Sequence, residues 1–347
     1  MTTLLAGDIG GTKTLLALYR LNGLEGPNPL ELLVEERFSS ADWDDLTPMV
    51  GHFLSGAAQA VPELVQPPAA ACFAVAGPVQ GGRARLTNLP WLLDQEGLAA
   101  TTGIGMVELV NDFAVLIYGL PHLQAHQRVT LRQGQADPTG SLLVLGAGTG
   151  LGVAYGQPTA QGLIALASEA AHAEFAPRCE AEWRLKCWLQ ADLGLERLSI
   201  ERVVSGTGLG HVGRWLLQER HPDGSHLLQR IPPADLPAAV AQAAEAGDSL
   251  AQEALERWLS AYGSVCGDLA LTGLSRGGIW LAGGTAGKLL EALRGPTFAQ
   301  AFLAKGRLAS VLETMPITAI TDPGIGQFSA ACRARMLLAA SAPAPTG

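Results

Sequence analysis

Two glycine turns, each between two apolar segments, have the composition of a phosphate-binding site. The first turn is Gly10-Gly11-Thr12, which follows an apolar segment that contains Asp8. Its glycines permit positive φ and close approach of a ligand to the backbone. Successive backbone N–H groups in such a turn form a concave anion site, to which Thr12 adds a hydroxyl donor. Asp8 repels phosphate, but it can hold a hydrated Mg²⁺ that bridges to phosphate oxygens. The structural alternative is a plain glycine hairpin.

The second turn, Gly146-Ala147-Gly148-Thr149-Gly150-Leu151-Gly152, repeats the pattern of strand, Thr-bearing glycine turn and strand. It lacks the Lys of a Walker A loop and does not match G-x-G-x-x-G, and a strand rather than a helix follows it. The repetition indicates two copies of one β-β-β unit facing each other across a cleft. A third turn, Gly283-Gly284, follows another predicted strand and is either a nucleotide contact or a closely packed βα loop.

Polar side chains that could carry acid–base chemistry or bind hydroxyl groups follow the apolar segments. Asn111 and Asp112 come directly after the strand predicted over 105–110. Ligands of open α/β sheets gather beyond the carboxyl ends of strands, but Asn and Asp are also the best helix N-caps, so both roles stay open. The other candidates are polar residues that could equally lie on the surface or near a helix N-terminus: Glu169, His172 and Glu201.

The elements that must position these residues are strands and helices in alternating groups. We predict strands over 4–8, 14–20, 30–38, 69–76, 105–110, 141–145, 153–155, 278–282 and 316–321, helices over 45–60, 180–192, 210–221, 249–274 and 322–340, a turn over 22–29 and a frayed end over 341–347. Asp322-Pro323 has the pattern of an N-cap followed by a first helical residue. The β-β-β start differs from a Rossmann domain, in which a helix follows the glycines.

The composition excludes several classes of protein. The 347 residues favour two domains, and 48% apolar residues provide for ordinary globular cores. A net charge of −9 without a basic run argues against nucleic acid as a partner. Five cysteines without C-x-x-C spacing indicate reduced thiols in a cytoplasmic protein. We find no signal peptide and no apolar run of about 18 residues, so we expect no membrane span.

Taken together, the motifs resemble the hexokinase/actin-like ATPase superfamily and, more narrowly, the bacterial glucokinase family. The resemblance extends from Leu4 to about Arg335. The pieces that are specific in combination are Leu86-Thr87-Asn88-Leu89-Pro90-Trp91, Val110-Asn111-Asp112-Phe113, Gly146–Gly152, Phe175-Ala176-Pro177 and Glu201-Arg202-Val203-Val204-Ser205-Gly206.

The resemblance implies an α/β fold of two ribonuclease H-like (actin-like ATPase) domains with a central active-site cleft. The smaller domain would comprise 1–122 plus 322–347, and the larger 123–321. ATP and Mg²⁺ are the implied cofactors, with Asp8 binding Mg²⁺ through water. The implied ATP-binding residues are Asp8, Gly10, Gly11, Thr12, Gly148, Thr149 and Gly150 for phosphates and metal, and Gly283 and Gly284 near the adenosine. A cytoplasmic homodimer is also implied.

The resemblance further implies phosphorylation of glucose to glucose 6-phosphate, the first step of glycolysis. Sugar hydroxyls both donate and accept hydrogen bonds, which carboxylates and an amide can match. The implied sugar-binding residues are Asn111, Asp112, Glu169, His172 and Glu201. Asp112 would be the general base that takes the proton of the 6-hydroxyl as it attacks the γ-phosphoryl group. Closure of the domains on glucose would exclude water.

One segment departs from the family pattern. The family shows Glu-Gly-Gly-His, whereas this chain has Glu169-Ala170-Ala171-His172. If the loop needs positive φ, each alanine would strain it by roughly 1–2 kcal/mol. The departure leaves open a kinase for another hexose or an amino sugar. The glycine turns would equally serve a non-catalytic actin-like nucleotide-binding protein, which is the other alternative. A nicotinamide-dependent oxidoreductase is disfavoured by the glycine pattern, and a sugar-responsive repressor by the absence of a helix-turn-helix and a Cys-rich zinc loop.

Overall fold

The computed structural model describes residues 1–23, 30–86 and 89–341. The turn predicted over 22–29, Thr87-Asn88 of one family motif and the frayed end over 341–347 lie wholly or mostly outside these residues. The chain divides into two compact units. Unit 1 comprises Met1–Gln124, Pro158–Ala167 and Pro323–Gly347, and unit 2 comprises Ala125–Gln157 and Ser168–Asp322.

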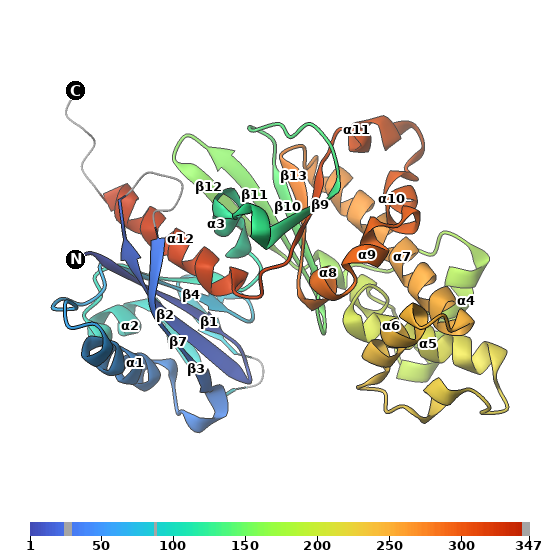
Figure 1. The fold of residues 1–347 in the computed structure, drawn as a ribbon, viewed down its shortest axis with the longest axis horizontal. Helices are drawn as coiled ribbons and strands as arrows, with labels where there is room; N and C mark the ends of the chain where they lie inside the picture. The colour runs from blue at the N-terminus through green and yellow to red at the C-terminus, as the bar shows by residue number, and fades with distance from the viewer. Residues whose placement is uncertain (24–29, 87–88, 342–347) are drawn as a thin grey trace. The chain divides into compact units, whose positions relative to one another are not determined.

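Unit 1 is built on a mixed sheet with strand order β3-β2-β1-β4-β8 and on a small antiparallel sheet with order β5-β6-β7 (Figure 1). Its strands are β1 (Thr3–Ile9), β2 (Lys13–Leu21), β3 (Leu30–Ser39), β4 (Ala70–Val75), β5 (Val79–Gln80), β6 (Arg83–Arg85), β7 (Leu92–Asp94) and β8 (Val107–Asn111). Its helices are the 3₁₀ helices η1 (Ser40–Asp42) and η2 (Leu120–His122) and the α-helices α1 (Leu46–Ala60), α2 (Gln95–Thr102), α3 (Leu116–Gly119) and α12 (Ile325–Ser341).

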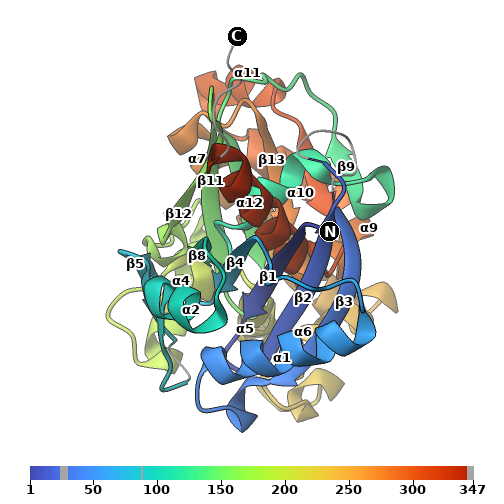
Figure 2. The same cartoon turned by 90° about the vertical axis from the view of Figure 1, so that its left-hand side faces the viewer.

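The parallel part of this sheet decides which side chains meet. β1 and β8 both pair in parallel with the fully buried β4, through the partners Asp8 and Ala74 on one side and Val75 and Asn111 on the other. The carboxyl ends of the three strands therefore lie at one edge of the sheet. Leu5 and Ile9 of β1 share a core with α1, which covers one face of β1–β3 (Figure 2), whereas Asp8 points to the opposite face, toward α12.

Unit 2 contains a mixed sheet with order β12-β11-β10-β13-β14-β9. Its strands are β9 (Arg128–Arg132), β10 (Leu142–Ala147), β11 (Leu151–Thr159), β12 (Gly162–Ser168), β13 (Gly278–Ala282) and β14 (Ile317–Ile320), of which the segment 158–167 is grouped with unit 1. Its α-helices are α4 (Glu180–Leu193), α5 (Gly206–Arg220), α6 (Leu236–Glu245), α7 (Ser249–Gly273), α8 (Gly284–Lys288), α9 (Leu290–Arg294), α10 (Pro296–Leu303) and α11 (Ala309–Glu313). Its 3₁₀ helices are η3 (Ala125–Gln127), η4 (Ala170–His172), η5 (Ile200–Arg202), η6 (Leu227–Arg230) and η7 (Gly306–Leu308).

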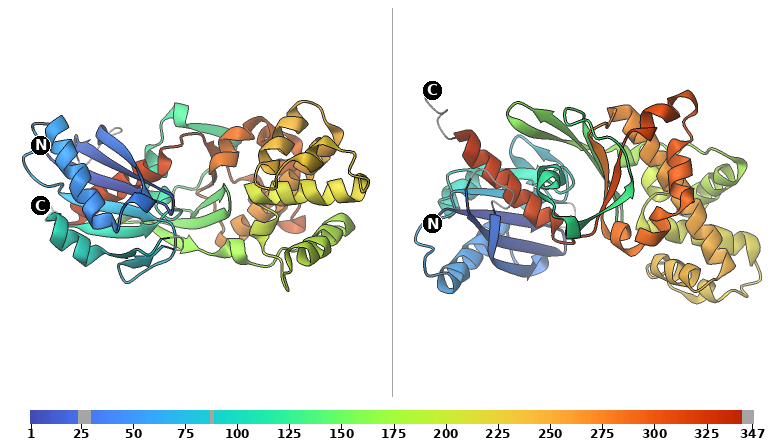
Figure 3. Two further views of the ribbon diagram at one scale, coloured as in Figure 1. Left: turned by 90° about the horizontal axis from the view of Figure 1, so that it is seen from below. Right: turned by 45° about the horizontal axis from the view of Figure 1, so that its top comes forward.

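The 25-residue helix α7 is the centre of the helical layer of unit 2. It packs against α5, α6 and α10, and Figure 3 shows the helices from α4 to α7 gathered at one end of the unit. Gly263 and Gly267 of α7 have no room for a Cβ, because the carbonyl oxygens of Phe298 and Phe302 in α10 would lie 2.2 Å and 2.5 Å from it. These two glycines therefore allow the backbone of α10 to come close to α7.

The predicted strands and long helices are confirmed, with shifts of a few residues at their ends. One helix start was wrong: α12 begins at Ile325 and not at Asp322-Pro323. A helix start at Ile325 places Gly326 in the first turn, next to Asp8. No helix in the described part of the chain is both long and apolar enough to cross a membrane.

Candidate active site

Asp8 and Asp112 form a pair of carboxylates in unit 1. Asp8 lies near the end of β1, and Asp112 directly follows β8, on the other side of β4. Burial raises the pKa of Asp8. Burial and, secondly, the negative charge of Asp8 raise the pKa of Asp112 to about 6, against hydrogen bonds that lower it. A carboxylate with a pKa near 6 is a usable general base at neutral pH.

Asn111 holds Asp112 in place. Its Oδ1 accepts hydrogen bonds from the backbone N–H groups of Phe113, at 3.1 Å, and Ala114, at 3.0 Å. Its Nδ2 donates to the carbonyl oxygen of Gly77, at 3.1 Å, and to Oδ1 of Asp112, at 3.0 Å. Asn111 thus stabilises the turn that follows β8, whereas the N-cap of α3 is Val115, which has no side-chain cap bond, so the predicted helix-cap role is wrong for Asn111. The predicted sugar contact of Asn111 would replace or share one of these bonds.

The two oxygens of Asp112 have different surroundings. Oδ1 accepts from Nδ2 of Asn111 and from the backbone N–H of Phe113, at 3.0 Å each. Within the described residues, no hydrogen bond is formed by Oδ2. One oxygen thus fixes the orientation of the carboxylate, and the other is available to take a proton.

The first glycine turn joins β1 to β2 and is held by Ser40 of η1. The Ser40 hydroxyl donates to the carbonyl oxygen of Gly10, at 2.9 Å, and its backbone N–H donates to that of Thr12, at 3.0 Å. Neither Gly10 nor Gly11 has positive φ, so positive φ is not why glycines stand here. Glycine is required at position 10 because a Cβ would lie 2.9 Å from the carbonyl oxygen of Lys13.

The second glycine turn, between β10 and β11, is anchored by the N-terminus of α5. The backbone N–H of Gly206 donates to the carbonyl oxygen of Gly148, and the Thr207 hydroxyl donates to that of Thr149, both at 2.7 Å. Gly148 and Gly150 do not have positive φ either. The turn is therefore supported by two hydrogen bonds from the start of α5, and a fixed shape is what a preformed anion site requires.

The third turn meets the second in the same unit. The Thr285 hydroxyl donates to the carbonyl oxygen of Ala147, at 2.6 Å. Gly283 has a φ of +82°, and a Cβ there would lie 3.0 Å from the same carbonyl oxygen. Glycine is thus required at position 283 both by backbone conformation and by close approach.

His172 lies on η4 and Glu201 on η5, two 3₁₀ helices that pack together, and Glu169 directly precedes η4. The backbone N–H of Ile200 donates to the carbonyl oxygen of Ala173, at 2.9 Å, which joins the two segments. Oε2 of Glu169 is 3.7 Å from Nε2 of His172, and 73% and 56% of these side chains are exposed. The structure therefore brings the three polar residues of unit 2 to one region and leaves two of them open to a ligand.

The alanines of the Glu169–His172 segment are not strained. Ala170 and Ala171 form the 3₁₀ helix η4, and Leu274 is the one residue other than glycine with positive φ in the described part of the chain. The conformation that would strain alanine is therefore absent from this loop, and the expected penalty does not apply.

A comparison with protein-family models matches residues 5–337 to the model described as Glucokinase. The chain belongs to the glucokinase family. The resemblance predicted from the motifs is thereby confirmed. A glucokinase of Synechocystis sp. is 42% identical to this family member, over 94% of the chain and 96% of that relative.

Solved structures confirm the predicted actin-like fold class for this glucokinase-family chain. A glucokinase from an Antarctic psychrotroph has a TM-score of 0.81 and 29% identity, and the match covers 96% of this chain and 99% of that one. A ROK-family glucokinase from Streptomyces griseus, solved with glucose and AMPPNP, has a TM-score of 0.60 and 18% identity, with 96% and 99% covered. The latter likeness concerns the fold alone. The chain is thus an enzyme of the glucokinase family with two mixed sheets.

Four residues that support the site in this family member were missed by the sequence analysis. They are Ser40, Thr207, Thr285 and Gly326. Thr207 and Thr285 stand beside glycines, which is a weak signal in the sequence. Ser40 and Gly326 carried no signal, because their partners Gly10 and Asp8 are about 30 and more than 300 residues away along the chain.

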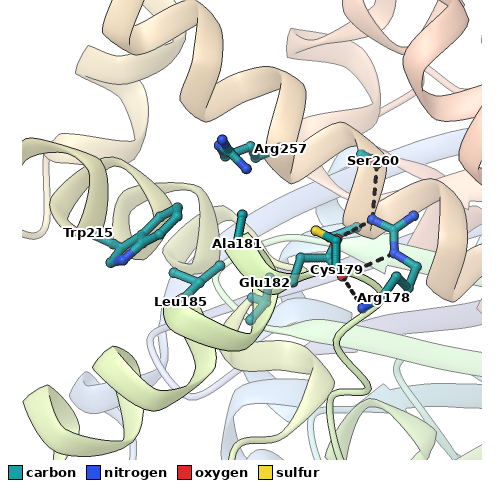
Figure 4. Close-up of a pocket in the computed structure, with 10 residues that line it drawn as sticks. Arg178, Cys179, Ala181, Glu182, Leu185, Trp215, Arg257 and Ser260 are labelled. Carbon is teal, nitrogen blue, oxygen red and sulfur yellow. Dashed lines mark hydrogen bonds and ion pairs between the residues drawn. The ribbon is translucent and has the colours of Figure 1, made fainter. Parts of the chain in front are cut away.

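A cavity of about 290 Å³ in unit 2 contains none of the predicted site residues (Figure 4). It lies between α4 and α7, with Trp215 of α5 at its side. Arg178 donates to Glu182 and, at 3.0 Å, to Ser260, and Arg257 lies over the Trp215 ring while it pairs with Glu253. Each arginine that lines the cavity is therefore already paired with a carboxylate, although Glu253 is shared with Arg220.

Proposed function

We propose that this protein transfers the γ-phosphoryl group of ATP to the 6-hydroxyl of glucose, with Asp112 as the general base. The observation that carries the proposal is the state of Asp112: Asn111 and Phe113 orient it through Oδ1, and its pKa is raised to about 6. Such a carboxylate is ionised at neutral pH and basic enough to take a hydroxyl proton as the oxygen attacks.

Asn111, Asp112, Glu169, His172 and Glu201 are proposed as the sugar-binding residues. Glu169, His172 and Glu201 offer carboxylates and an imidazole at two adjoining 3₁₀ helices, with Glu169 directly before the first of them. These groups match the donor and acceptor character of sugar hydroxyls. The relaxed conformation of Ala170 and Ala171 supports a competent sugar loop. Glucose is the sugar found in the Streptomyces griseus relative, and other hexoses are outcomes of the test below.

The proposed ATP site uses the three glycine turns, with Gly10, Gly11 and Thr12, with Gly148, Thr149 and Gly150, and with Gly283 and Gly284. The backbone of such turns offers N–H groups to phosphate oxygens. Asp8 is the proposed partner of Mg²⁺, through water. The described residues contain no group of three or more His, Cys, Asp or Glu side chains placed to hold a metal. A single carboxylate fits Mg²⁺, which usually keeps water and binds substrate phosphates besides one or two carboxylates, and its charge would stabilise the transferred phosphoryl group.

The division of labour follows from this chemistry. Asp112 accepts the proton and aligns the hydroxyl, and Asn111 keeps Asp112 in its orientation. The glycine turns fix the phosphates, since phosphoryl transfer needs alignment and charge stabilisation more than covalent chemistry. The two-domain division at 122/123 and 321/322, the homodimer and the cytoplasmic location remain part of the proposal on the basis of the family resemblance.

The test is ADP release from Mg-ATP by the purified protein, with and without a panel of hexoses and amino sugars. We expect strong stimulation by glucose, and a fall of about 10²–10⁴ in kcat for Asp112→Asn with nucleotide binding retained. Stimulation by another sugar alone would overturn the choice of glucose. Wild-type turnover in Asp112→Asn would show that Asp112 is a cap and not a base.

A further inference from the structure

Glu201 contacts the second glycine turn as well as the proposed sugar-binding region. Its Oε2 accepts a hydrogen bond of 2.9 Å from the backbone N–H of Leu151, the first residue of β11. Leu151 is opposite Ala147 in the last pair of the β10–β11 ladder. The carbonyl oxygen of Ala147 accepts a hydrogen bond from the Thr285 hydroxyl. The Glu201 carboxylate thus serves as the acceptor for the backbone N–H of Leu151 at the end of the turn.

The same carboxylate fills the space beside Gly150. A Cβ on Gly150 would lie 2.4 Å from Oε2 of Glu201. Gly150 does not have positive φ, so its backbone would accept alanine and only the carboxylate stands in the way. Glycine at position 150 is therefore explained by the approach of Glu201 and not by the conformation of the turn.

We infer that Glu201 is a positioning residue that couples sugar binding to nucleotide binding through its two oxygens. The inference rests on the proposed function. Within the described residues Oε1 forms no hydrogen bond, so a sugar hydroxyl can bind Oε1 while Oε2 stays on the N–H of Leu151. A sugar that fixes the position of Glu201 also fixes the turn proposed to bind phosphate. By thermodynamic linkage, the nucleotide then raises the affinity for the sugar by the same factor as the sugar raises the affinity for the nucleotide.

The expected size of the coupling follows from other linked sites, where one ligand changes the affinity for another by about 5–150-fold. The experiment measures the Kd of AMPPNP in Mg²⁺ by calorimetry, with and without saturating glucose, on the full-length protein. For the unaltered protein we expect saturating glucose to lower the Kd of AMPPNP by at least about 5-fold. In Gly150→Ala, which displaces the carboxylate without removing it, the ratio of the two Kd values should approach one.

Two further variants separate this role from sugar binding alone. Glu201→Gln keeps an acceptor for Leu151 and a polar group for the sugar, so it should retain most of the coupling. Glu201→Ala should abolish the coupling, and adding Gly150→Ala to it should change nothing more, because both act on one contact. Gly148→Ala is the matched control: its Cβ meets nothing within 4 Å, so the ratio should persist even if AMPPNP binds more weakly.

The outcomes distinguish this inference from the proposed function. If glucose is phosphorylated but does not alter the Kd of AMPPNP, or if Gly150→Ala keeps the full ratio, the coupling role of Glu201 is wrong and the proposed function stands. If neither glucose binding nor glucose-dependent ADP release occurs, the proposed function itself fails, and the coupling fails with it. Thermal unfolding of each variant confirms that the compared proteins are folded.

Discussion

Asp8 and Asp112 lie on either side of β4, and the charge of Asp8 helps to hold the pKa of Asp112 at about 6. The parallel pairing of β1 and β8 with β4 brings the two carboxylates to one edge of the sheet. The metal-binding carboxylate of the proposed mechanism therefore also tunes the base.

The pH profile should report the ionisation of Asp112. Because the base must be deprotonated, kcat/KM for glucose should rise with pH through about 6 and level off above it. Asp8→Asn removes one of the causes of the raised pKa, so the rising limb should move to lower pH even though the rate falls. Steady-state kinetics between pH 5 and 8 measure the limb. If the rising part of the pH profile stays at the same pH in Asp8→Asn, the charge of Asp8 does not raise the pKa of Asp112.

Asp112→Asn should stabilise the fold at neutral pH. A carboxyl whose pKa is raised in the folded state binds more protons folded than unfolded, so its contribution to stability falls as pH rises from about 4 to about 6. Removal of the charge should raise the free energy of unfolding by about 1–3 kcal/mol at pH 7. Urea unfolding at pH 4 and pH 7 measures the gain, which should be smaller at pH 4.

A matched control for this variant is Asp137→Asn. Thr139 donates hydrogen bonds to the Asp137 carboxylate from its side chain, at 2.7 Å, and its backbone, at 2.9 Å, and they lower the pKa of Asp137. This group contributes stability above its unfolded pKa, so its neutralisation should destabilise the protein at pH 7. A gain in both variants would mean that net charge, and not the surroundings of Asp112, explains the result.

Gly326→Ala should misplace Asp8. A Cβ at position 326 would lie 2.9 Å from Oδ2 of Asp8, which must shift to make room. Displacements of about 1 Å in a catalytic group reduce rates by up to about 10²-fold, so we expect kcat/KM for Mg-ATP to fall by about 10–10²-fold. Gly51→Ala in α1 is the control, because its Cβ meets nothing within 4 Å and its activity should be unchanged.

Ser40→Ala should loosen the first glycine turn. The change leaves the buried Thr14 hydroxyl without its 3.0 Å partner and removes the hydrogen bond to Gly10, which should lower the free energy of unfolding by about 1–3 kcal/mol and raise KM for ATP. Urea unfolding and ATP titrations measure the two effects. Ser55→Ala is the control: its hydroxyl bonds to Gly51 one turn earlier in an exposed part of α1, so it should be close to neutral.

The motifs on single segments could be predicted from the sequence. Asp8, the glycine turns and Asn111-Asp112 each lie at a strand end, and alternation of apolar runs with turn residues marks such ends. The sequence alone does not specify the structural reason for each glycine. Glycines in such turns permit positive φ, but neither Gly10 in the first turn nor Gly150 in the second has it. A Cβ at position 10 would meet the carbonyl oxygen of Lys13, and a Cβ at position 150 would meet the carboxylate of Glu201.

The sequence by itself determined the family, the order of strands and turns, and the residue types available for chemistry, because these depend on local patterns along the chain. Only the tertiary structure decided which of these groups meet. The strand order β1-β4-β8 sets Asp8 beside Asp112, the start of α12 brings Gly326 against Asp8, and the packing of η5 puts Glu201 on the N–H of Leu151. Such contacts join residues 50 to more than 300 positions apart, and they arise from sheet pairing and helix packing, which no local pattern specifies.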